Sequence, residues 1–208
     1  MNEDLDLQFR NHLCEHDATF FEVIERHPRL ACPTVQPPFE SLVRIVSGQQ
    51  LSVLAAAKVY QRVEWALGRV VSADTVTATS FDTLRAAGLS RAKTRSLIEL
   101  AKFAGPNELH LKQWLRAPWP QFREVLLEVR GIGPWSVDMF AMFGMGHLDI
   151  FASGDLGLRM AMERHLDVPE NQKPAVYDQR ALAWSPYRTL GSLHLWHSLK
   201  PDHERFQT

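Results

Sequence analysis

Apolar residues recur at intervals of three and four along almost the whole chain, and short polar or proline-containing segments interrupt them. Phe39, Leu42, Val43 and Val46 form one such group. This spacing places apolar side chains on one face of a helix, whereas a half-buried strand would alternate strictly. The pattern therefore predicts a chain built from helices.

One β-branched run, residues 71–77, has a composition typical of strands. However, Ser72 and Ser80 resemble helix N-caps, each followed by an acid in the first turn, and no second strand is predicted nearby. We interpret this run as part of short helices, so the predicted fold class is all-α.

Small polar residues and prolines mark other helix boundaries. Asp17 and Ser52 are predicted N-caps, and the prolines of residues 33–38 form a stiff connection that no helix could cross. Gly48-Gln49-Gln50-Leu51 is then a tight junction between two helices. Its simplest interpretation is a turn whose glutamines face water.

The second half of the chain shows the same punctuation. Gly88-Leu89-Ser90 ends one helix and begins another. A strongly periodic helix containing Phe122 and Val129 is predicted to end at Arg130. Two final helices are expected over residues 175–184 and 186–199.

Gly131-Ile132-Gly133 joins two predicted helices in the central segment. The glycines permit positive φ and close backbone approach, and Ile132 can pack between the flanking helices. Pro134 suits the first position of the next helix. The predicted turn presents backbone N–H groups at a helix start, which suits a phosphate. A plain turn between helices is the alternative.

A lone acid, Asp155, follows Ser153-Gly154 at the start of another predicted helix. The helix dipole stabilises a carboxylate there by about 0.3–1 kcal/mol and favours its ionised form. An N-cap without further function is the commonest use of aspartate at such a position.

The length and charge of the chain allow several classes of partner. Its 208 residues suffice for one substantial core or for two small lobes. The net charge of −1 argues against a generic nucleic-acid coat, but backbone N–H groups can still bind phosphate. Arg91, Lys93 and Arg95 cluster at a helix start, where they oppose the helix dipole. An anionic ligand and a solvated face explain this cluster equally well.

Other sequence features limit the cellular context. No apolar run approaches the roughly 20 residues of a membrane span. The acidic, mixed N-terminus fits neither a signal peptide nor a transit peptide. Cys14 and Cys32 cannot complete a four-ligand metal or iron–sulfur site alone, and a reducing compartment is expected.

Four separated motifs carry a family resemblance. They are IVSGQQLS at 45–52, AAGLSRAKTRSL at 86–97, GIGPWSVDMFAMF with LDIFASGDLGL at 131–158, and PYRTLGSLHLW at 186–196. In this order they resemble the helix–hairpin–helix DNA glycosylases, and in detail the alkylpurine branch, 3-methyladenine DNA glycosylase II. The resemblance covers most of the chain from about Phe39.

This resemblance implies an all-α helix–hairpin–helix glycosylase fold with two helical lobes and a cleft between them. The expected lobes are residues 39–146 and residues 1–38 plus 147–208. The larger bacterial members carry an additional N-terminal β domain, which this chain is too short and too helical to contain.

The resemblance also assigns roles to matched residues. Asp155 falls on the catalytic aspartate. Gln50, or less favourably Leu51, falls on the residue that enters the duplex when the target nucleotide flips out. Trp135 and Trp196 fall on aromatic positions that line the base pocket, although core packing is the usual role of such residues.

Further residues receive roles in the same way. Met139 occupies a pocket position that is aromatic in some relatives, which implies a wider pocket. The residues expected to contact the DNA backbone are Gly131, Ile132, Gly133, Ser90, Arg91 and Lys93. His194, two residues before Trp196, could face the pocket or lie in the core, and we favour the core.

The implied chemistry suits these residues. An alkylated purine of the 3-methyladenine or 7-methylguanine type is positively charged, so its glycosidic bond is already weakened. An ionised Asp155 beneath the sugar would stabilise the developing cation and orient a water. Indole rings would hold the cationic base by cation–π attraction of about 0.5–2 kcal/mol.

The end product depends on a lysine that this chain lacks. Glycosylases that also cut the strand use a lysine amine two residues after the second hairpin glycine. Trp135 stands at that position, and no lysine lies between Lys112 and Lys173. The resemblance therefore implies a monofunctional N-glycosylase without lyase activity.

The expected partner is double-stranded DNA containing alkylated bases, bound by a monomer without membrane association. No cofactor is expected, and the resemblance leaves room only for a monovalent cation at the hairpin when DNA is bound. The expected location is the cytoplasm, with the nucleoid, in a bacterium, or the nucleus in a eukaryote.

Three other interpretations remain open. The same hairpin could belong to a non-catalytic module that binds abasic or distorted DNA, although such a module has no use for an anion close to the phosphates. A glycosylase could instead act on mismatched or oxidised bases. A helical protein-interaction domain ranks last, because it needs neither hairpin nor acid.

Overall fold

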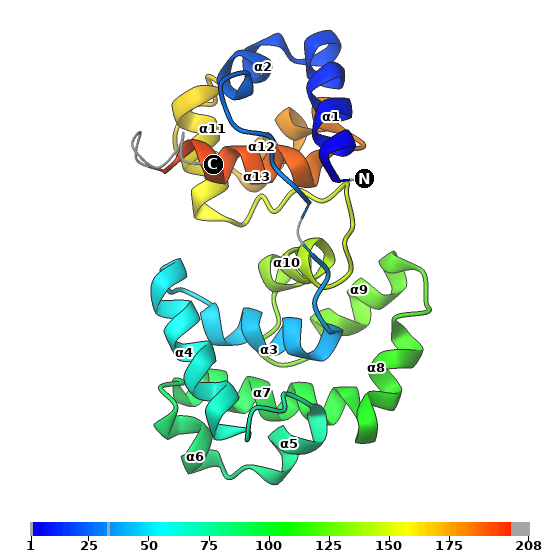
Figure 1. Ribbon diagram of the computed structural model, residues 1–208, viewed down its shortest axis with the longest axis vertical. Coiled ribbons are helices and arrows are strands. Elements are labelled where there is room, and N and C mark those ends of the chain that lie inside the picture. The colour runs from blue at the N-terminus through cyan, green and yellow to red at the C-terminus, as the bar shows by residue number, and fades with distance from the viewer. Residues whose placement is uncertain (1, 33, 201–208) are drawn as a thin grey trace. The chain divides into compact units, whose positions relative to one another are not determined.

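The computed structural model describes residues 2–32 and 34–200, and these residues form helices and connecting turns without a strand (Figure 1). They divide into two compact units. Unit 1 comprises Met1–Thr34 and Ala141–Thr208, and unit 2 comprises Val35–Phe140. The predicted all-α class is confirmed.

Unit 1 combines the beginning and the end of the chain. Its helices are α1 (Asn2–His16), α2 (Ala18–Ile24), α11 (Leu156–His165), α12 (Pro174–Ala181), the 3₁₀ turn η2 (Leu182–Trp184) and α13 (Arg188–Ser198). Helix α13 packs against α11, α2 and η2 (Figure 1). The last two predicted helices are confirmed, with the first of them ending in a 3₁₀ turn.

Asp17 and Trp184 organise one side of this core. The Asp17 carboxylate accepts from the Phe20 backbone N–H at 3.1 Å, so the predicted N-cap is confirmed. The same carboxylate accepts from Trp184 Nε1 at 2.7 Å and pairs with Arg180. Gly191 is required beside the indole, because a Cβ there would lie 2.9 Å from Trp184 Cε3.

A second polar group, Asp6, is completely buried and joins both ends of the chain. Arg10 Nε donates to it at 2.6 Å, and His194 Nε2 lies 2.7 Å from Asp6 Oδ1. His194 is also fully buried, so its predicted place in the core is confirmed. Burial alone would raise the pKa of Asp6, but the hydrogen bonds from His194 and Arg10 outweigh it and lower the pKa from 3.8 to about 2.

Removal of this buried carboxylate is expected to destabilise the protein strongly. Asp6→Ala leaves a buried histidine and a part-buried guanidinium without their partner, which costs about 3 kcal/mol of unfolding free energy. Urea unfolding at pH 7 measures the difference, with the exposed Glu15→Ala on the same helix as control. Equal effects of the two substitutions would contradict the structural role of Asp6.

The pH dependence of this contribution has a defined direction. Because the pKa of Asp6 is lower in the folded protein, its stabilising effect is complete above the usual value of 3.8. The contribution of the Asp6 carboxylate to the free energy of unfolding is lost as the pH falls through about 2. The difference between wild type and Asp6→Ala is therefore expected to shrink over that interval.

Unit 2 contains the middle of the chain. Its helices are α3 (Pro38–Gly48), α4 (Val53–Ala66), α5 (Ala73–Ala78), α6 (Phe81–Ala86), α7 (Arg91–Ala104), the 3₁₀ turn η1 (Pro106–Glu108), α8 (Leu109–Trp114), α9 (Trp119–Leu127) and α10 (Pro134–Phe143), whose last three residues belong to unit 1. Helix α3 packs against α4 and α7 (Figure 1).

Serine side chains begin four helices of unit 2, as the sequence predicts or allows. Ser52, Ser72, Ser80 and Ser90 each accept a hydrogen bond from a backbone N–H in the first turn of α4, α5, α6 and α7. The β-branched run near Val76 is helical, because the Ser72 cap and the burial of Val76 outweigh its strand propensity.

Helix α9 ends earlier than its apolar periodicity suggests. Its last residue is Leu127, so the prediction of Arg130 is wrong. The N–H groups of Glu128 and Val129 bond three residues back, at 3.2 Å each, which tightens the chain into the following turn. Val129 is still buried in that turn, and this is why the apolar pattern outlasts the helix.

Among the described residues, no helix is long and apolar enough to cross a membrane.

Candidate active site and hairpin

Asp155 lies at the N-cap of α11 and is half-buried. Its Oδ1 accepts from the Leu158 backbone N–H at 3.0 Å, which is the N-cap bond that the sequence suggests as its simplest role. The same Oδ1 accepts from the indole Nε1 of Trp196 at 2.9 Å. The carboxylate is therefore held by a side chain of α13, a helix far from Asp155 in the sequence, in addition to its own helix.

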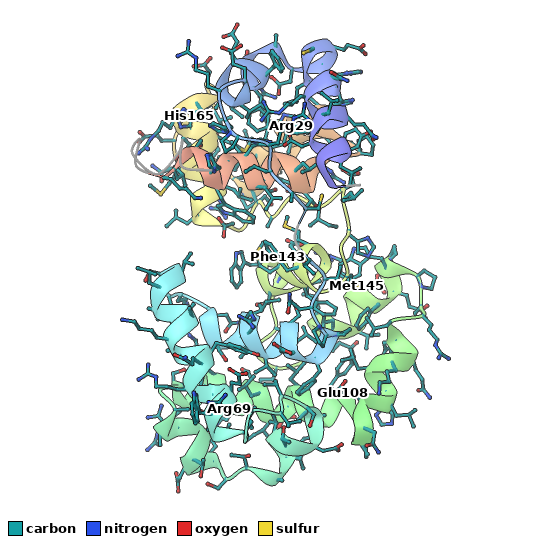
Figure 2. All side chains as sticks on the ribbon, viewed as in Figure 1. Arg29, Arg69, Glu108, Phe143, Met145 and His165 are labelled. Atoms are coloured by element: carbon teal, nitrogen blue, oxygen red, sulfur yellow. The ribbon has the colours of Figure 1, made fainter. Side chains whose placement is uncertain are left out.

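Trp196 reaches Asp155 from α13 because Gly157 leaves room for the indole. A Cβ at Gly157 would lie 3.3 Å from Trp196 Cδ1 and 3.1 Å from Asp155 Oδ1. Phe143, which Figure 2 labels at the end of α10, also stacks with Trp196, with ring centroids 6.2 Å apart and an interplanar angle of 30°. Trp196 therefore joins the carboxylate to a second aromatic ring, and its place in the base pocket stays a prediction.

The turn that precedes Asp155 is fixed by α11 itself. Arg159 Nε donates to the Ser153 carbonyl at 2.6 Å, and the Asp155 N–H donates to the Ala152 carbonyl at 2.8 Å. Ser153 Oγ also donates to Asp178 at 3.0 Å. These bonds limit the freedom of the catalytic candidate's backbone.

Helix α13 fixes the earlier part of the same loop. Arg188 Nε donates to Asp149 Oδ1 at 2.7 Å, and Thr189 Oγ1 donates to the His147 carbonyl at 2.7 Å. Burial alone would raise the pKa of Asp149, but hydrogen bonds from Arg188 and Ser185 outweigh it and lower the pKa. Because α13 also carries Trp196, one helix orders both the loop and the partner of Asp155.

Of the two glycines in the hairpin between α9 and α10, Gly131 has the positive φ that the sequence allows and Gly133 does not. Gly131 has φ +86°, and a Cβ there would lie 1.8 Å from Ser96 Oγ. Ile132 is buried at 4% exposure, as expected for a side chain that packs inside the protein. A Cβ at Gly133 would meet nothing within 4 Å. The first glycine is thus required for packing, while the space beside the second glycine is open.

The predicted wedge residues lie on an exposed turn between α3 and α4. Gln50 is exposed and has φ +57°, and Leu51 is 41% exposed. Two large apolar side chains, Val53 and Leu54, follow at 86% and 78% exposure. The sequence predicts that the Gln49 side chain faces water, but it binds other parts of unit 2 instead.

The basic cluster at the start of α7 separates into two kinds of residue. Arg91 and Arg95 are exposed. Lys93 is half-buried, and its Nζ donates to the carbonyl oxygens of Ser47 at 3.0 Å and Gln49 at 2.6 Å. The Ser90 hydroxyl accepts a hydrogen bond from the Lys93 backbone N–H and so caps the start of α7. The roles of these residues in DNA backbone contact stay predictions.

The remaining pocket candidates belong to α10. Trp135 is half-buried, and Met139 is buried at 6% exposure. Their predicted place in the base pocket stays a prediction. Within residues 2–32 and 34–200, no three His, Cys, Asp or Glu side chains gather in a way that could hold a metal ion.

Comparison with known proteins identifies the class to which this fold and hairpin belong. Residues 43–186 match the family described as HhH-GPD superfamily base excision DNA repair protein. Because the match covers more than half of the chain, the chain belongs to the HhH-GPD superfamily.

Particular members of the superfamily are similar over most of the chain. DNA-3-methyladenine glycosidase from Bacillus halodurans is 31% identical, with a TM-score of 0.73 over 89% of this chain and 85% of that one. The Schizosaccharomyces pombe 3-methyladenine DNA glycosylase Mag1, solved with abasic DNA, is 23% identical, with a TM-score of 0.80 over 91% and 95%. DNA-3-methyladenine glycosylase 2 of Escherichia coli is 26% identical over 181 residues, 82% of this chain but 61% of that protein. The resemblance to the alkylpurine branch is confirmed.

Several residues that shape the site carry no local signal in the sequence. Arg159, Arg188 and Phe143 contact the loop or the indole, yet each looks like an ordinary helical residue. Thr189 lies in the first turn of α13, as many other polar residues do in helices. Only the packing of the folded chain shows that they support Asp155 and Trp196.

Proposed function

We propose that this chain is a DNA glycosylase that removes alkylated purines, of the 3-methyladenine and 7-methylguanine type, from double-stranded DNA in base excision repair. The observation that carries the proposal is the Asp155 carboxylate at the start of α11, held by two N–H donors beside an aromatic surface. The names of the similar proteins support the substrate class.

The proposed reaction uses the charge of Asp155. When the glycosidic bond breaks, the sugar develops positive charge, and a fixed carboxylate stabilises that charge without reorganising. The carboxylate also orients the attacking water. The water oxygen bonds to the sugar carbon, the base leaves with the electrons of the glycosidic bond, and the proton that the water loses passes to solvent. Because an alkylated purine is already cationic, its departure needs little acid catalysis.

The proposed base pocket has Trp196 as one wall. An indole face attracts a cationic base by about 0.5–2 kcal/mol. The contact between Trp196 Nε1 and Asp155 keeps this wall next to the reacting sugar. We include Trp135 and Met139 in the pocket, as the family resemblance implies. Stacking tolerates different base shapes, so a broad range of alkylated purines is expected.

The proposed DNA contacts lie in unit 2. The start of α10 after Gly133 suits a backbone phosphate, because the amides of a first helical turn lack intrahelical acceptors. Gln50 and Leu51 are proposed to fill the space of the flipped nucleotide, at a flipping cost of a few kcal/mol that is lower for damaged bases. Binding as a monomer is part of the proposal.

The reaction is proposed to need no cofactor. A monovalent cation at the hairpin would support DNA binding, and the carbonyl oxygens of such a turn are ligands that hard cations accept. One of them, the Gly131 carbonyl, already accepts from Gln49 Nε2.

The test of the proposed function is release of free base from a panel of duplexes, each with one defined lesion. Release of alkylated purines above the spontaneous rate supports the proposal. Release of only oxidised or mismatched bases would indicate a different glycosylase specificity. Binding to abasic duplex without any release would indicate a non-catalytic DNA-binding protein.

We expect the product to be an intact strand with an abasic site. Trp135 occupies the position where a lyase would need a lysine, and an indole cannot form a Schiff base with the sugar. Borohydride added during turnover is therefore expected to trap no covalent protein–DNA adduct, and the strand is expected to break only after alkali treatment. A trapped adduct would contradict the monofunctional assignment.

A further inference from the structure

The exposed turn that carries Gln50 and Leu51 has an unusual backbone for its residues. The Leu51 N–H donates to the Gly48 carbonyl at 3.1 Å, and Gln50 takes φ +57° at the third position of the turn. A positive φ at that position is normally taken by glycine or asparagine. This backbone conformation is unfavourable for a glutamine, and contacts around the turn offset its cost.

Lys93 is one of the residues that stabilise this turn. Helix α3 ends at Gly48, and its last carbonyl groups have no partners within the helix. Lys93 Nζ donates to two carbonyls at this end, those of Ser47 and Gln49. A cation is favourable at the negative end of the helix dipole. Two of the three ammonium donors thus bind protein oxygens.

Gln49 is the second residue that stabilises the turn, and it does so by binding to the hairpin. Its Nε2 donates to the Gly131 carbonyl at 2.9 Å and to Ser136 Oγ at 2.9 Å. Gly131 opens the hairpin turn, and Ser136 lies in the first turn of α10, where it is 2% exposed. One amide therefore joins the wedge turn to both sides of the hairpin.

Helix α7 supports both elements with one face. Lys93 lies under the end of α3, and Ser96, three residues later on the same face, lies against Gly131 so closely that no Cβ fits between them. Within unit 2, the turn of Gln50 and Leu51 is therefore joined to the hairpin, and α7 contacts both of them.

We propose that Gln49 and Lys93 are positioning residues that hold the Gln50–Leu51 turn at a fixed distance from the hairpin. This inference rests on the proposed function. Neither residue touches the reacting atoms. Their effect is that DNA gripped by the hairpin has the wedge residues already placed for nucleotide flipping. Lys93 is thereby assigned to the protein framework instead of to a phosphate.

The test of Gln49 compares two substrates that differ in the cost of flipping. In a paired duplex the wedge must displace the target base, whereas the same lesion in a single-nucleotide bulge has no pairing to break. Gln49→Ala is expected to slow single-turnover base release from the paired duplex by about 10-fold and from the bulge by less than about 3-fold. The exposed Gln61→Ala on α4 is the matched control.

A double-mutant cycle separates positioning from general destabilisation. If Gln49 acts only through the wedge, Gln49→Ala adds little to a variant that already carries Gln50→Ala and Leu51→Ala. Equal losses on both substrates, no loss on either, or full additivity would overturn the positioning role. Absence of base release by the wild type on every substrate would overturn the proposed function as well.

The test of Lys93 is the salt dependence of binding to an abasic-site duplex. Each lysine–phosphate contact contributes about one unit to the slope of log Kd against log salt. Lys93→Met is expected to leave this slope unchanged and to reproduce the substrate pattern of Gln49→Ala. A slope reduced by about one would show that Lys93 binds phosphate and would overturn its positioning role.

Discussion

Asp155→Asn is expected to lower base release from alkylated duplex DNA by at least about 100-fold, in line with the loss of one preorganised electrostatic group in other enzymes. The substitution removes the negative charge that is proposed to stabilise the cationic sugar. Release should be measured under single-turnover conditions, so that product dissociation does not mask the chemical step.

This variant isolates the charge from the structure. Asparagine caps helices about as well as aspartate, and its carbonyl oxygen can still accept from the Leu158 N–H and from Trp196 Nε1. The unfolding free energy is therefore expected to change by no more than about 1 kcal/mol, the part that the charge contributes through the helix dipole. A large activity loss with small stability loss would identify Asp155 as catalytic.

The matched control is Asp167→Asn. Asp167 is exposed, follows α11 and has φ +54°, which asparagine tolerates as well as aspartate. This variant is expected to retain wild-type release. If wild type and Asp155→Asn release base at equal rates, or if neither releases any, the catalytic assignment of Asp155 fails.

Local signals explain why much of the fold could be predicted. The caps Asp17, Ser52 and Ser90 depend on residues within one helical turn, so the sequence nearby contains all the information that determines them. The hairpin glycines and Asp155 are recognisable for the same reason. The apolar periodicity misplaced the end of α9, because Val129 stays buried after the helix has ended.

Long-range contacts explain what could not be predicted. Asp6 meets His194 across 188 positions, and Gln49 meets Gly131 across 82. A glutamine in an exposed turn looks the same in sequence whether it faces water or binds a distant carbonyl. The family resemblance supplies roles for residues that contact DNA, but it says less about the residues that hold them in place.

Substitution by alanine is expected to destabilise the protein strongly at Gly131 and only slightly at Gly133. Gly131→Ala forces a methyl group against Ser96 Oγ at 1.8 Å and a side chain onto a residue with φ +86°. The combined clash and backbone strain should cost about 3 kcal/mol of unfolding free energy. Gly133→Ala meets nothing within 4 Å and should cost no more than about 1 kcal/mol.

For DNA affinity the order is expected to be reversed, with the larger loss at Gly133. If a phosphate approaches the start of α10, a methyl group at position 133 stands between the backbone amides and the phosphate oxygens. Gly133→Ala should therefore weaken binding to an abasic-site duplex by at least about 10-fold while the protein stays folded. Urea unfolding and equilibrium binding, measured on both variants, check the pair.

The comparison is informative because each glycine serves as control for the other. Loss of binding at Gly133 without loss of stability would mean that DNA, and not the protein, occupies the space beside that residue. Normal binding by a folded Gly133→Ala variant would instead reduce the hairpin to a packing turn. The DNA would then have to be held elsewhere on unit 2, with the exposed Arg91 and Arg95 as the next residues to substitute.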